Sequence, residues 1–439
     1  MFELVIHDNC DAKENAIVTV GIIGLGFVGL PLSLLFADNG FKVIGIDSDE
    51  SKIEKLNNGV SYLPDITNQE LQEVITTSKI KGTVDYDIVE TLDVIIVCVP
   101  TPLTSYKTPN LSYLKTVGEE LAPRIRKGQL IILESSTFPG TTKEVFQPIL
   151  EKNGLKAGED FFLAYSPERI DPGNKHYKVS EVPKIVSGVS SNCLQKICNL
   201  YKKVFQKIVP VSSTQIAEFT KLLENAYRFI NISFINELAI LSDTMEIDLW
   251  EAINAASTKP YGFTPFYPGP GIGGHCIPVD PLYLAWKSNQ CGFDNKMIRL
   301  SDEINDLMID YIVQKIKNLL FDKSSKRVLI YGVTYKKDIN DIRESPAIKI
   351  MHLLLQLGIE VSYHDPYVPE MNISECKYTS ISLTENTLQQ SDCVVILTDH
   401  SNIPLDKILG HANLVYDVRN VTNRLKSKAK VIRFGGGEG

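Results

Sequence analysis

Short apolar runs, separated by turns and helix-like segments, mark the N-terminal part of the chain. Buried strands are predicted at Ile17–Ile23, Phe41–Ile46, Val94–Val99 and Leu130–Leu133, with a helix at Leu30–Asn39 after the first strand. Strands that are apolar on both faces belong in parallel sheets that helices cover on both sides. The pattern therefore predicts a doubly wound α/β domain of the Rossmann class.

Helical periodicity replaces this alternation in the middle of the chain. Between Ser212 and Ile253, apolar residues recur at steps of three and four, and neither glycine nor proline occurs before Pro260. The recurring positions are Ile216, Phe219, Leu222, Leu223, Ala226 and Ile230. We expect one long helix here, which either packs into the core or forms a seam between two subunits.

A second alternation of strands and helices follows the loop rich in proline and glycine at 260–281. Its predicted elements are a strand at Lys326–Gly332, a helix at Pro346–Leu357 and strands at Glu360–Tyr363 and Cys393–Thr398. They predict a second, smaller Rossmann-like α/β domain. We expect domains at 1–210, 211–325 and 326–439, and a disordered tail at Gly435–Gly439.

Composition argues against several classes of partner. The formal charge is -8 and the basic residues are spread along the chain, which disfavours nucleic acid or an anionic membrane as the main partner. No apolar run reaches the roughly 18 residues of a transmembrane helix. Residues 1–15 lack the basic start and apolar centre of a signal peptide. We expect a cytoplasmic protein with no membrane partner.

The cysteines and histidines give no sign of a disulfide framework or a metal site. The eight cysteines form no CxxC pair, and the seven histidines have no HxxxH or HExxH spacing. Cys98 and Cys393 lie within apolar runs, where a thiol behaves as a small core side chain. We therefore expect reduced cysteines, these two in the core, and no bound metal.

The turn after the first strand carries a dinucleotide-binding motif. This GxGxxG consists of Gly24, Leu25, Gly26, Phe27, Val28 and Gly29. Its glycines permit a tight turn, close approach of a pyrophosphate and close helix packing. Asp47 ends the second strand, where a carboxylate accepts hydrogen bonds from both ribose hydroxyls and repels a 2′-phosphate. NAD is therefore the expected cofactor, with Pro100, Thr101 and Thr137 near later strand ends as further contacts.

A glycine-rich loop presents a thiol. Four glycines fall within Gly269–Gly274, and Cys276 and Asp280 follow. Glycines let the backbone approach a ligand closely, whereas a purely structural loop needs no thiol followed by an acid. Thiolates are nucleophiles in covalent catalysis, so Cys276 is the candidate nucleophile.

Two other segments carry candidate polar side chains. Lys221 and Asn225 are four residues apart and share one face of the long helix. Taken alone, this pair fits a solvated surface better than a site. Glu168 and Arg169 lie in a polar loop after the apolar run that ends at Ala164.

Further motifs follow GxGxxG in a characteristic order. They are Val-Pro-Thr-Pro, Ser-Thr-Phe-Pro-Gly, Ser-Pro-Glu-Arg, Lys-Leu-Leu-Glu-Asn, Gly-Gly-His-Cys-Ile-Pro-Val-Asp-Pro and Asp-Ile-Arg-Glu-Ser-Pro. The set resembles the UDP-glucose/GDP-mannose dehydrogenase family over nearly the whole chain, from about Ile17 to Arg433. The resemblance implies an NAD-binding Rossmann domain, a helical middle that dimerises and a C-terminal domain for a UDP-sugar.

The resemblance also implies a reaction. The family takes the C6 alcohol of a nucleotide sugar through an aldehyde to a carboxylate, with two NAD consumed. By motif, Cys276 captures the aldehyde as a thiohemiacetal, and water hydrolyses the thioester left by the second oxidation. Lys221 and Asn225 stabilise the oxyanion, and an ammonium near the thiol is expected to lower its pKa. The groups that position water and manage protons are Asp280, Thr137 and Glu168.

The sequence after Glu168 distinguishes two branches of this family. Residues 169–174 differ from the branch that acts on UDP-glucose and are similar to the N-acetyl-hexosamine branch. The implied substrate is UDP-N-acetylglucosamine, for surface-polysaccharide precursors, with the manno and galacto epimers as alternatives and UDP-glucose less favoured. The implied substrate contacts are Glu168, Arg169, Lys221, Asn225, Gly273, Gly274 and Lys336, or Lys337 in its place, with Arg343 reaching the cofactor.

Two other classes of function stay open on the sequence. A catalytically silent regulator with this fold would not need the thiol, the lysine and the asparagine, all of which are present. A two-electron dehydrogenase of hydroxy acids would not need Cys276. His275 is not assigned to a Cys–His dyad, because neighbours in an extended loop rarely face each other.

Overall fold

The first lobe contains a doubly wound sheet. The computed structural model describes residues 18–63, 65–77, 79–169, 177–323 and 325–437. Eight strands lie in the order β3-β2-β1-β4-β5-β6-β7-β8. They are β1 (Thr19–Ile23), β2 (Lys42–Ile46), β3 (Ile80–Thr83), β4 (Val94–Val97), β5 (Leu130–Leu133), β6 (Phe162–Tyr165), β7 (Lys184–Gly188) and β8 (Ile208–Pro210). Within the described residues, the pair of β6 and β7 is the only antiparallel one in this sheet. The first six strands have the order of dinucleotide-binding folds.

Helices cover both faces of this sheet, which explains its uniformly apolar strands. The helices are α1 (Gly29–Asp38), α2 (Glu50–Asn57), α3 (Asn68–Thr76), α4 (Ser112–Leu121), α5 (Gln147–Leu150) and α6 (Ser191–Tyr201). Helices α1, α3 and α6 pack with Val20 and Ile96 on one face, and α4 and α5 pack with Ile23 and Ile95 on the other. Cys98 lies just beyond the carboxyl end of the central strand β4, where it is partly buried and packs against the core that contains Val20 and Ile96.

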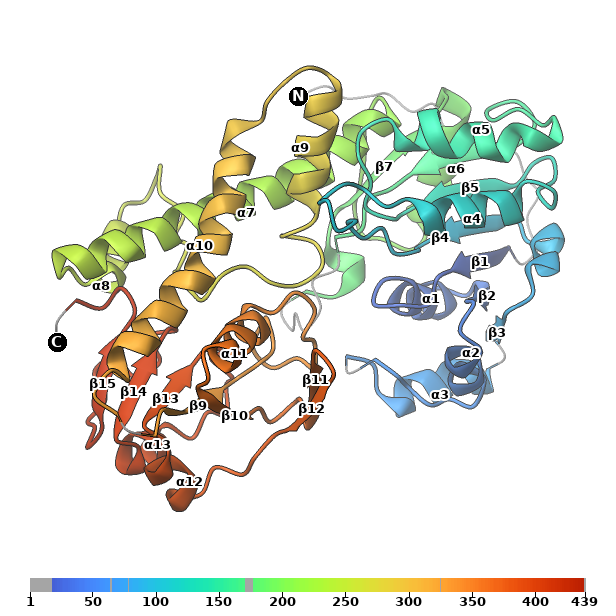
Figure 1. Ribbon diagram of the computed structural model, residues 1–439. Coiled ribbons are helices and arrows are strands. Elements are labelled where there is room, and N and C mark those ends of the chain that lie inside the picture. The colour runs from blue at the N-terminus through green and yellow to red at the C-terminus, as the bar shows by residue number, and fades with distance from the viewer. Residues whose placement is uncertain (1–17, 64, 78, 170–176, 324, 438–439) are drawn as a thin grey trace.

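Four helices connect the two lobes. They are α7 (Thr214–Met245), α8 (Leu249–Ala256), α9 (Asp280–Gln290) and α10 (Lys296–Leu319). The expectation of one helix over 212–253 is wrong at its end. Glu246 adopts a left-handed conformation with φ of 56°, and Asp248 accepts a hydrogen bond from the Glu251 N–H at 3.1 Å, which starts α8. Helix α7 runs from the first sheet to the side of the second (Figure 1).

The apolar positions of α7 lie on two different faces. Leu222 and Ala226 are buried, whereas Ile216, Phe219 and Leu223 are exposed. The exposed positions continue along the helix at steps of three, four and seven, so they share one face. We call this face the apolar stripe, and it consists of Ile216, Phe219, Leu223, Tyr227, Phe234, Leu241 and Met245.

The second lobe repeats the architecture on a smaller scale. Its parallel sheet has the order β10-β9-β13-β14-β15, beside the antiparallel hairpin of β11 and β12. The strands are β9 (Arg327–Tyr331), β10 (Glu360–His364), β11 (Glu370–Ile373), β12 (Cys376–Thr379), β13 (Cys393–Ile396), β14 (Leu414–Asp417) and β15 (Lys430–Arg433). The helices are α11 (Pro346–Gln356), α12 (Glu385–Gln390) and α13 (Leu405–His411). Cys393 is buried in this sheet, as expected. The predicted fold class, two α/β parts around a helical middle, is confirmed.

The glycines near the C-terminus are packed, so the expectation of a disordered tail is wrong for Gly435–Gly437. The Gly435 N–H donates to Asp243 at 2.8 Å, and its carbonyl accepts from the Leu249 N–H at 2.8 Å. Both Gly435 and Gly437 have positive φ, which glycine adopts without strain. The segment therefore ties the last strand to the junction of α7 and α8. Residues 438 and 439 lie outside the described part of the chain.

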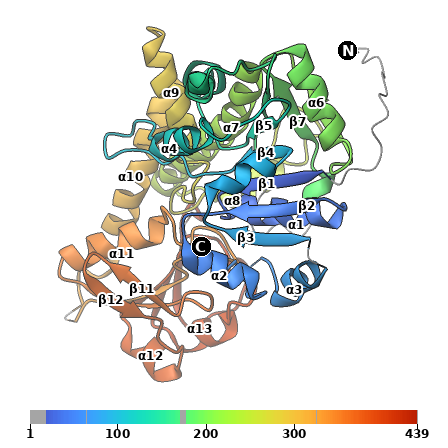
Figure 2. The same ribbon diagram turned by 90° about the vertical axis from the view of Figure 1, so that its right-hand side faces the viewer.

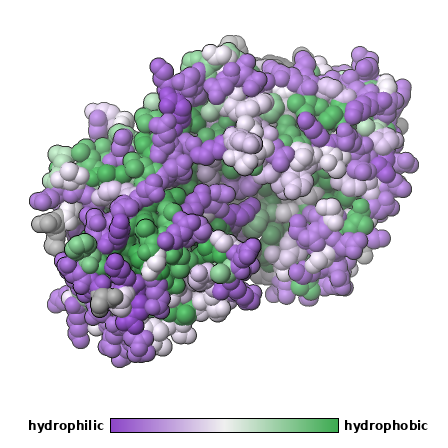
Figure 3. Space-filling view, in the orientation of Figure 1, coloured by the Kyte–Doolittle hydropathy of each residue, from purple (hydrophilic) through white to green (hydrophobic). Residues whose placement is uncertain are grey.

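A cleft separates the two lobes. Figures 1 and 2 show the two sheets side by side with the helical segment along one flank, and Figure 3 shows the surface hollowed between the lobes. The cleft has a volume of about 1260 Å³ and is lined by α1, α3 and Glu168 on one side and by Asp338 and Tyr367 on the other. Among the described residues, no helix has the length and apolar character needed to span a membrane.

Candidate active site

The three glycines of the first turn have the geometry of a dinucleotide site. Gly24 has a φ of 90°, and a Cβ there would lie 2.6 Å from the Cys98 carbonyl oxygen. A Cβ on Gly29 would lie 1.8 Å from the Gly24 carbonyl oxygen, so α1 packs against the turn only because residue 29 is glycine. A Cβ on Gly26 would meet nothing within 4 Å, which leaves its backbone open to a phosphate. The turn lies at the switch point between β1 and β4, and the half-buried Val28 is the N-cap residue of α1 beside it.

Asp47 closes this turn from the end of β2. Its Oδ2 accepts the Leu25 N–H at 2.8 Å and its Oδ1 accepts the Asp49 N–H at 3.0 Å. Each carboxylate oxygen has a second lone pair that a ribose hydroxyl can use. The Lys52 ammonium lies 3.5 Å away but is partly exposed. The open backbone at Gly26 and the carboxylate of Asp47 therefore fit NAD.

Thr101 and Thr137, near the ends of β4 and β5, differ in their side-chain hydrogen bonds. The Thr101 hydroxyl donates to the Ser136 carbonyl at 2.7 Å, and the Tyr283 hydroxyl on α9 donates to the Thr101 carbonyl at 2.6 Å. This anchors the loop that carries the exposed Pro100. Thr137 is fully buried, and its hydroxyl makes no hydrogen bond with the described residues, although Tyr165 lies close enough to interact. Because the Thr137 side chain has no solvent-exposed surface, its expected role with water stays a prediction.

The second lobe reaches the dinucleotide turn through Arg343. Its guanidinium lies 4.5 Å from the centre of the Phe27 ring, and Asp341 holds it at 2.6 Å. The Arg343 carbonyl also accepts the Gly274 N–H at 3.0 Å. Arg343 thus links the dinucleotide turn to the glycine-rich loop, which agrees with its expected place at the interface of the lobes.

The catalytic candidates of α7 and α9 meet at buried positions. Lys221 is 7% exposed and Asp280 is 1% exposed, so neither is a solvated surface residue. The Asn225 amide donates to Asp280 Oδ2 at 2.6 Å. The Asp280 N–H donates to the Cys276 carbonyl at 2.9 Å, and this turn fixes the acid next to the thiol. Cys276 keeps solvent-exposed surface that a ligand can reach, although protein atoms from several segments crowd around its thiol.

Burial dominates the ionisation of this group. It raises the pKa of Asp280 to about 6, against the opposing effects of Lys221 and Asn225. Burial and the charge of Asp280 raise the pKa of Cys276 to about 11, and the effects of Lys221 and Arg343 are smaller. Lys221 acts in the expected direction, but the expected net lowering of the thiol's pKa is wrong. The free protein therefore holds Cys276 as a thiol at neutral pH.

Glu168 and Arg169 follow β6 and point to different partners. Glu168 is 8% exposed, and its carboxylate accepts the Arg169 N–H at 2.6 Å and pairs with Lys184 at 3.5 Å. The Arg169 guanidinium pairs with Glu224 of α7 at 2.6 Å. Glu168 thus adds a second carboxylate near Cys276, after Asp280, whereas Arg169 is held by Glu224. Residues 170–174, which suggested the branch of the family, lie outside the described residues.

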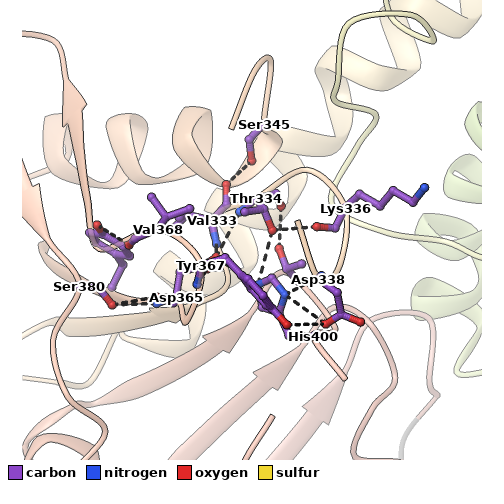
Figure 4. A network of polar contacts seen from close by, with 12 residues as sticks. Val333, Thr334, Lys336, Asp338, Ser345, Asp365, Tyr367, Val368, Ser380 and His400 are labelled. Atoms are coloured by element: carbon purple, nitrogen blue, oxygen red, sulfur yellow. Dashed lines mark hydrogen bonds and ion pairs between the residues drawn. The ribbon is translucent and has the colours of Figure 1, made fainter. Parts of the chain in front are cut away.

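Glycines of the Cys276 loop pack against the second lobe. A Cβ on Gly273 or Gly274 would lie 2.7 or 2.8 Å from Tyr335. This gives both glycines a packing role, and their contact with substrate stays a prediction. Lys336 accepts a hydrogen bond from Thr334 through its carbonyl, while its side chain extends away from the neighbouring polar network (Figure 4).

In the second lobe, as in the first, an aspartate at the end of a strand accepts a backbone N–H from the turn at the switch point of the sheet. Asp365 Oδ2 accepts the Val333 N–H at 2.7 Å, as Asp47 accepts the Leu25 N–H in the first lobe. His400 Nδ1 accepts the Asp338 N–H at 3.0 Å, so its Nε2 carries the proton and donates to Asp365 at 3.1 Å (Figure 4). This network fixes the loop of Thr334 to Asp338 between β9 and β13.

Sequence reasoning missed Glu218, one turn before Lys221 on α7. Its fully buried carboxylate accepts from the Gly140 N–H at 2.6 Å and from the Thr142 N–H at 2.7 Å. It therefore ties the turn that follows Thr137 to the helix that carries Lys221. The available signal was its spacing of three residues from Lys221.

Three models of one family match successive parts of the chain. The NAD binding domain matches residues 18–207, the central domain matches 215–307 and the UDP binding domain matches 329–424. The chain belongs to the UDP-glucose/GDP-mannose dehydrogenase family. The expected family, the NAD-dependent enzyme class and the NAD cofactor are thereby confirmed.

Its relatives include enzymes for two different hexosamines. UDP-N-acetyl-D-glucosamine 6-dehydrogenase of Pseudomonas aeruginosa is 34% identical over 94% of this chain and 99% of its own length. UDP-N-acetyl-D-mannosamine dehydrogenase of Methanococcus aeolicus is 31% identical over 95% of this chain and 91% of its own. The structure of a UDP-D-ManNAc dehydrogenase from Pyrococcus horikoshii superposes with a TM-score of 0.86 at 31% identity, covering 96% of this chain and 100% of that one.

Proposed function

We propose that this enzyme oxidises the C6 alcohol of a UDP-N-acetyl-hexosamine to the uronic acid, with UDP-N-acetylglucosamine as the best substrate. The convergence of Cys276, Lys221, Asn225 and Asp280 beside Arg343 carries the proposal. A thiol that a ligand can reach, with an ammonium, an amide and a carboxylate around it, suits covalent capture of an aldehyde.

The side chains divide the chemistry among them. NAD, when bound, accepts the hydride in each of the two oxidations. Asp280, with a pKa of about 6, is ionised at neutral pH and can take the proton of Cys276 as the sulfur adds to the aldehyde carbon. Lys221 and the second N–H of Asn225 donate to the resulting oxyanion.

Hydrolysis of the thioester needs a positioned water molecule. The proposed acceptor and base for that water are the hydroxyl of Thr137 and the carboxylate of Glu168. Attack of the water on the thioester carbon breaks the bond to sulfur. This releases the uronic acid and leaves Cys276 with its free thiol. Capture of the aldehyde on sulfur also prevents its escape between the two oxidations.

The choice between epimers follows the named relatives. The Pseudomonas relative supports the gluco compound, whereas the archaeal relatives act on the manno compound. We propose the gluco compound, because the Pseudomonas UDP-N-acetyl-D-glucosamine 6-dehydrogenase is 34% identical to this chain and the Methanococcus mannosamine enzyme is 31% identical.

A panel of UDP-sugars tests this substrate assignment. NADH formation is measured with UDP-N-acetylglucosamine, its manno and galacto epimers and UDP-glucose. We expect the highest kcat/KM for the gluco compound and at least about tenfold lower kcat/KM for UDP-glucose, which lacks the N-acetyl group. A preference for the manno epimer would overturn the choice of epimer, and a preference for UDP-glucose would overturn the substrate class.

We also propose that two copies pair through the apolar stripe of α7. The stripe places seven large apolar side chains on one exposed helix face. Exposed apolar surface of this extent is typical of a protein interface. The stripe is the proposed contact surface of the expected homodimer or higher homo-oligomer.

A further inference from the structure

A loop beside the dinucleotide turn is attached to three neighbouring segments. This loop, residues 98–111, joins β4 to α4, and we call it the β4 loop. It begins against the dinucleotide turn, because a Cβ on Gly24 would lie 2.6 Å from the Cys98 carbonyl oxygen and 3.3 Å from the Val99 Cα. A shift of the β4 loop would therefore alter the edge of the sheet where the dinucleotide binds.

The end of β5 makes the first attachment. The Ser135 hydroxyl donates to the Val99 carbonyl at 2.8 Å. The Ser136 carbonyl accepts the Thr101 hydroxyl at 2.7 Å. Both bonds join the ends of two neighbouring strands of the first sheet, so they hold the start of the β4 loop within the first lobe but do not connect it to the helical segment.

Helix α9, which stands beside the first lobe (Figure 1), makes the second attachment. The Tyr283 hydroxyl donates to the Thr101 carbonyl at 2.6 Å and lies 3.1 Å from the Pro102 carbonyl. The Tyr283 side chain is 0% exposed, and burial raises the pKa of its phenol, so the hydroxyl keeps its proton. The Pro102 carbonyl also accepts the Asn110 N–H at 2.9 Å, whereas within the described residues Tyr283 is the partner of the Thr101 carbonyl.

Helix α10 makes the third attachment, at the tip of the β4 loop. The Lys107 ammonium lies 2.6 Å from Asp302 and 3.3 Å from Asp306. The Lys107 side chain is 51% exposed, and ion pairs in contact with water contribute little to stability. The buried hydrogen bond of Tyr283 is thus the stronger link between the β4 loop and the helical segment.

Tyr283 lies on the helix face that also carries Asp280. The two residues are three positions apart on α9 and both are buried, so their side chains project to the same side. The Ser136 side chain forms a hydrogen bond with the Asp280 carboxylate, while its carbonyl accepts the Thr101 hydroxyl. One helical turn therefore carries both the acid beside the thiol and the group that holds the β4 loop.

The ring of Tyr283 lies in a small apolar core at the centre of the site. The other buried members of this core are Leu111, Phe138, Leu222 and Val279. Three of them are adjacent in the sequence to Thr137, Lys221 and Asp280. Because this packing fixes the ring, the hydroxyl has a fixed position, and its removal alone would leave the packing in place.

We propose that Tyr283 is a positioning residue that fixes the β4 loop, relative to the helical turn that carries Asp280, in the position that NAD binding requires. Tyr283 acts through the backbone of Thr101. The proposal rests on the expected contacts of Pro100 and Thr101 with the cofactor. It does not depend on the chemistry proposed for the sugar, because NAD binds before any oxidation.

Tyr283→Phe removes the hydroxyl and keeps the ring. A β4 loop without this hydrogen bond must be ordered when NAD binds, which lowers the affinity. We expect the Kd for NAD, measured by calorimetry without sugar, to rise about 3- to 10-fold. The Kd for UDP should stay within about twofold of the wild type, because the UDP binding domain of the family is the second lobe.

Tyr363→Phe is the matched control, with Tm as the check of folding for both variants. Tyr363 is also 0% exposed, and its hydroxyl donates to a backbone carbonyl, that of Val368, at 3.1 Å in the second lobe. The control loses the same kind of buried hydrogen bond far from the β4 loop. A Kd for NAD in Tyr283→Phe within about twofold of the value in Tyr363→Phe would overturn the proposal.

Hydrogen exchange of the β4 loop gives a second readout. In the ligand-free protein, peptides from residues 98–111 should exchange at least about threefold faster in Tyr283→Phe than in the wild type and in Tyr363→Phe. Unchanged exchange would show that the hydroxyl does not hold the loop. Faster exchange without a change in NAD affinity would show a merely structural attachment, and either result contradicts the proposal.

These measurements separate the inference from the proposed function, since neither needs turnover. An enzyme that shows the expected NAD affinities but forms no uronic acid contradicts the proposed function alone. An active enzyme in which Tyr283→Phe binds NAD as Tyr363→Phe does contradicts the role of Tyr283 alone.

Discussion

Around Cys276, loss of hydration outweighs the attraction of nearby positive charges. The thiol has a pKa of about 11 because burial and Asp280 disfavour the thiolate more than Lys221 and Arg343 favour it. Asp280, with a pKa of about 6, is the ionised neighbour that can accept the thiol's proton. The nucleophile is thus held protonated until a substrate changes its surroundings.

Alkylation of the free enzyme by iodoacetamide tests this ionisation. Because only the thiolate reacts and its pKa is raised, the rate at Cys276 should rise about tenfold per pH unit between pH 7 and pH 10. Mass spectrometry of the Cys276 peptide separates it from the exposed Cys291 and Cys376. A rate that is already constant at pH 7 would show a lowered pKa and contradict the account.

Two substitutions should move that rate in opposite directions. Asp280→Asn removes a negative charge and should speed alkylation of Cys276 at pH 8 by up to about tenfold, because the thiol's pKa falls. Lys221→Met removes a positive charge and should slow it. Lys115→Met, at an exposed position of α4, serves as the control without effect. Equal alkylation rates in all variants would show that Asp280 and Lys221 do not affect the pKa of Cys276, which contradicts the account.

At the residue scale, the spacing of residues in the sequence predicted the backbone roles correctly but did not predict the pKa values. Gly24, Gly29 and Asp47 could be assigned because a motif fixes the local backbone, and the structure gives them the expected geometry. The pKa of Cys276 could not be predicted, since its charged neighbours come from separate segments that sequence alone does not place. The same holds for the contacts of Tyr283, whose carbonyl partners lie 182 and 181 positions earlier in the chain.

At the scale of elements, the two faces of helix α7 have different roles. Its buried face carries Glu218, Lys221 and Asn225 toward the site, and its exposed face carries the apolar stripe. The helical period was predictable from the sequence. The assignment of apolar residues to the exposed face was not, because both faces contain them.

A charge on the stripe should break the proposed dimer. Phe219→Glu combined with Leu223→Glu places two carboxylates at positions 44% and 53% exposed in one chain, so folding of that chain is spared. We expect sedimentation to give a dimer for the wild type and a monomer for this variant. Lys55→Glu, exposed on α2, is the matched control and should stay dimeric. A wild type that is monomeric at micromolar concentration contradicts the proposal.

The C-terminal segment should contribute measurably to stability. A chain that ends at Phe434 loses the bonds of Gly435 to Asp243 and Leu249, and we expect the free energy of unfolding in urea to fall by about 1 to 3 kcal/mol. A chain that lacks only residues 438 and 439 is the control. Equal stability of the two shortened chains would mean that the packed glycines contribute nothing.

At the scale of the whole molecule, the site exists only where the lobes meet. The first lobe supplies the dinucleotide turn, the helical segment supplies Lys221 and Cys276, and the second lobe supplies Arg343 against Phe27. Both α/β lobes could be predicted, because strands that are apolar on both faces need helices on both sides. The reversal of β7 and the contact of Arg343 with Phe27 could not, since they depend on how distant segments pack.

The number of NADH molecules formed per sugar tests the central claim most directly. With limiting UDP-N-acetylglucosamine and excess NAD, the account predicts two NADH and one uronic acid per sugar consumed, because the aldehyde stays on Cys276 between the oxidations. Cys276→Ala should bind NAD as the wild type does and form no uronic acid. One NADH per sugar in the wild type, or normal acid formation by Cys276→Ala, would contradict the covalent mechanism.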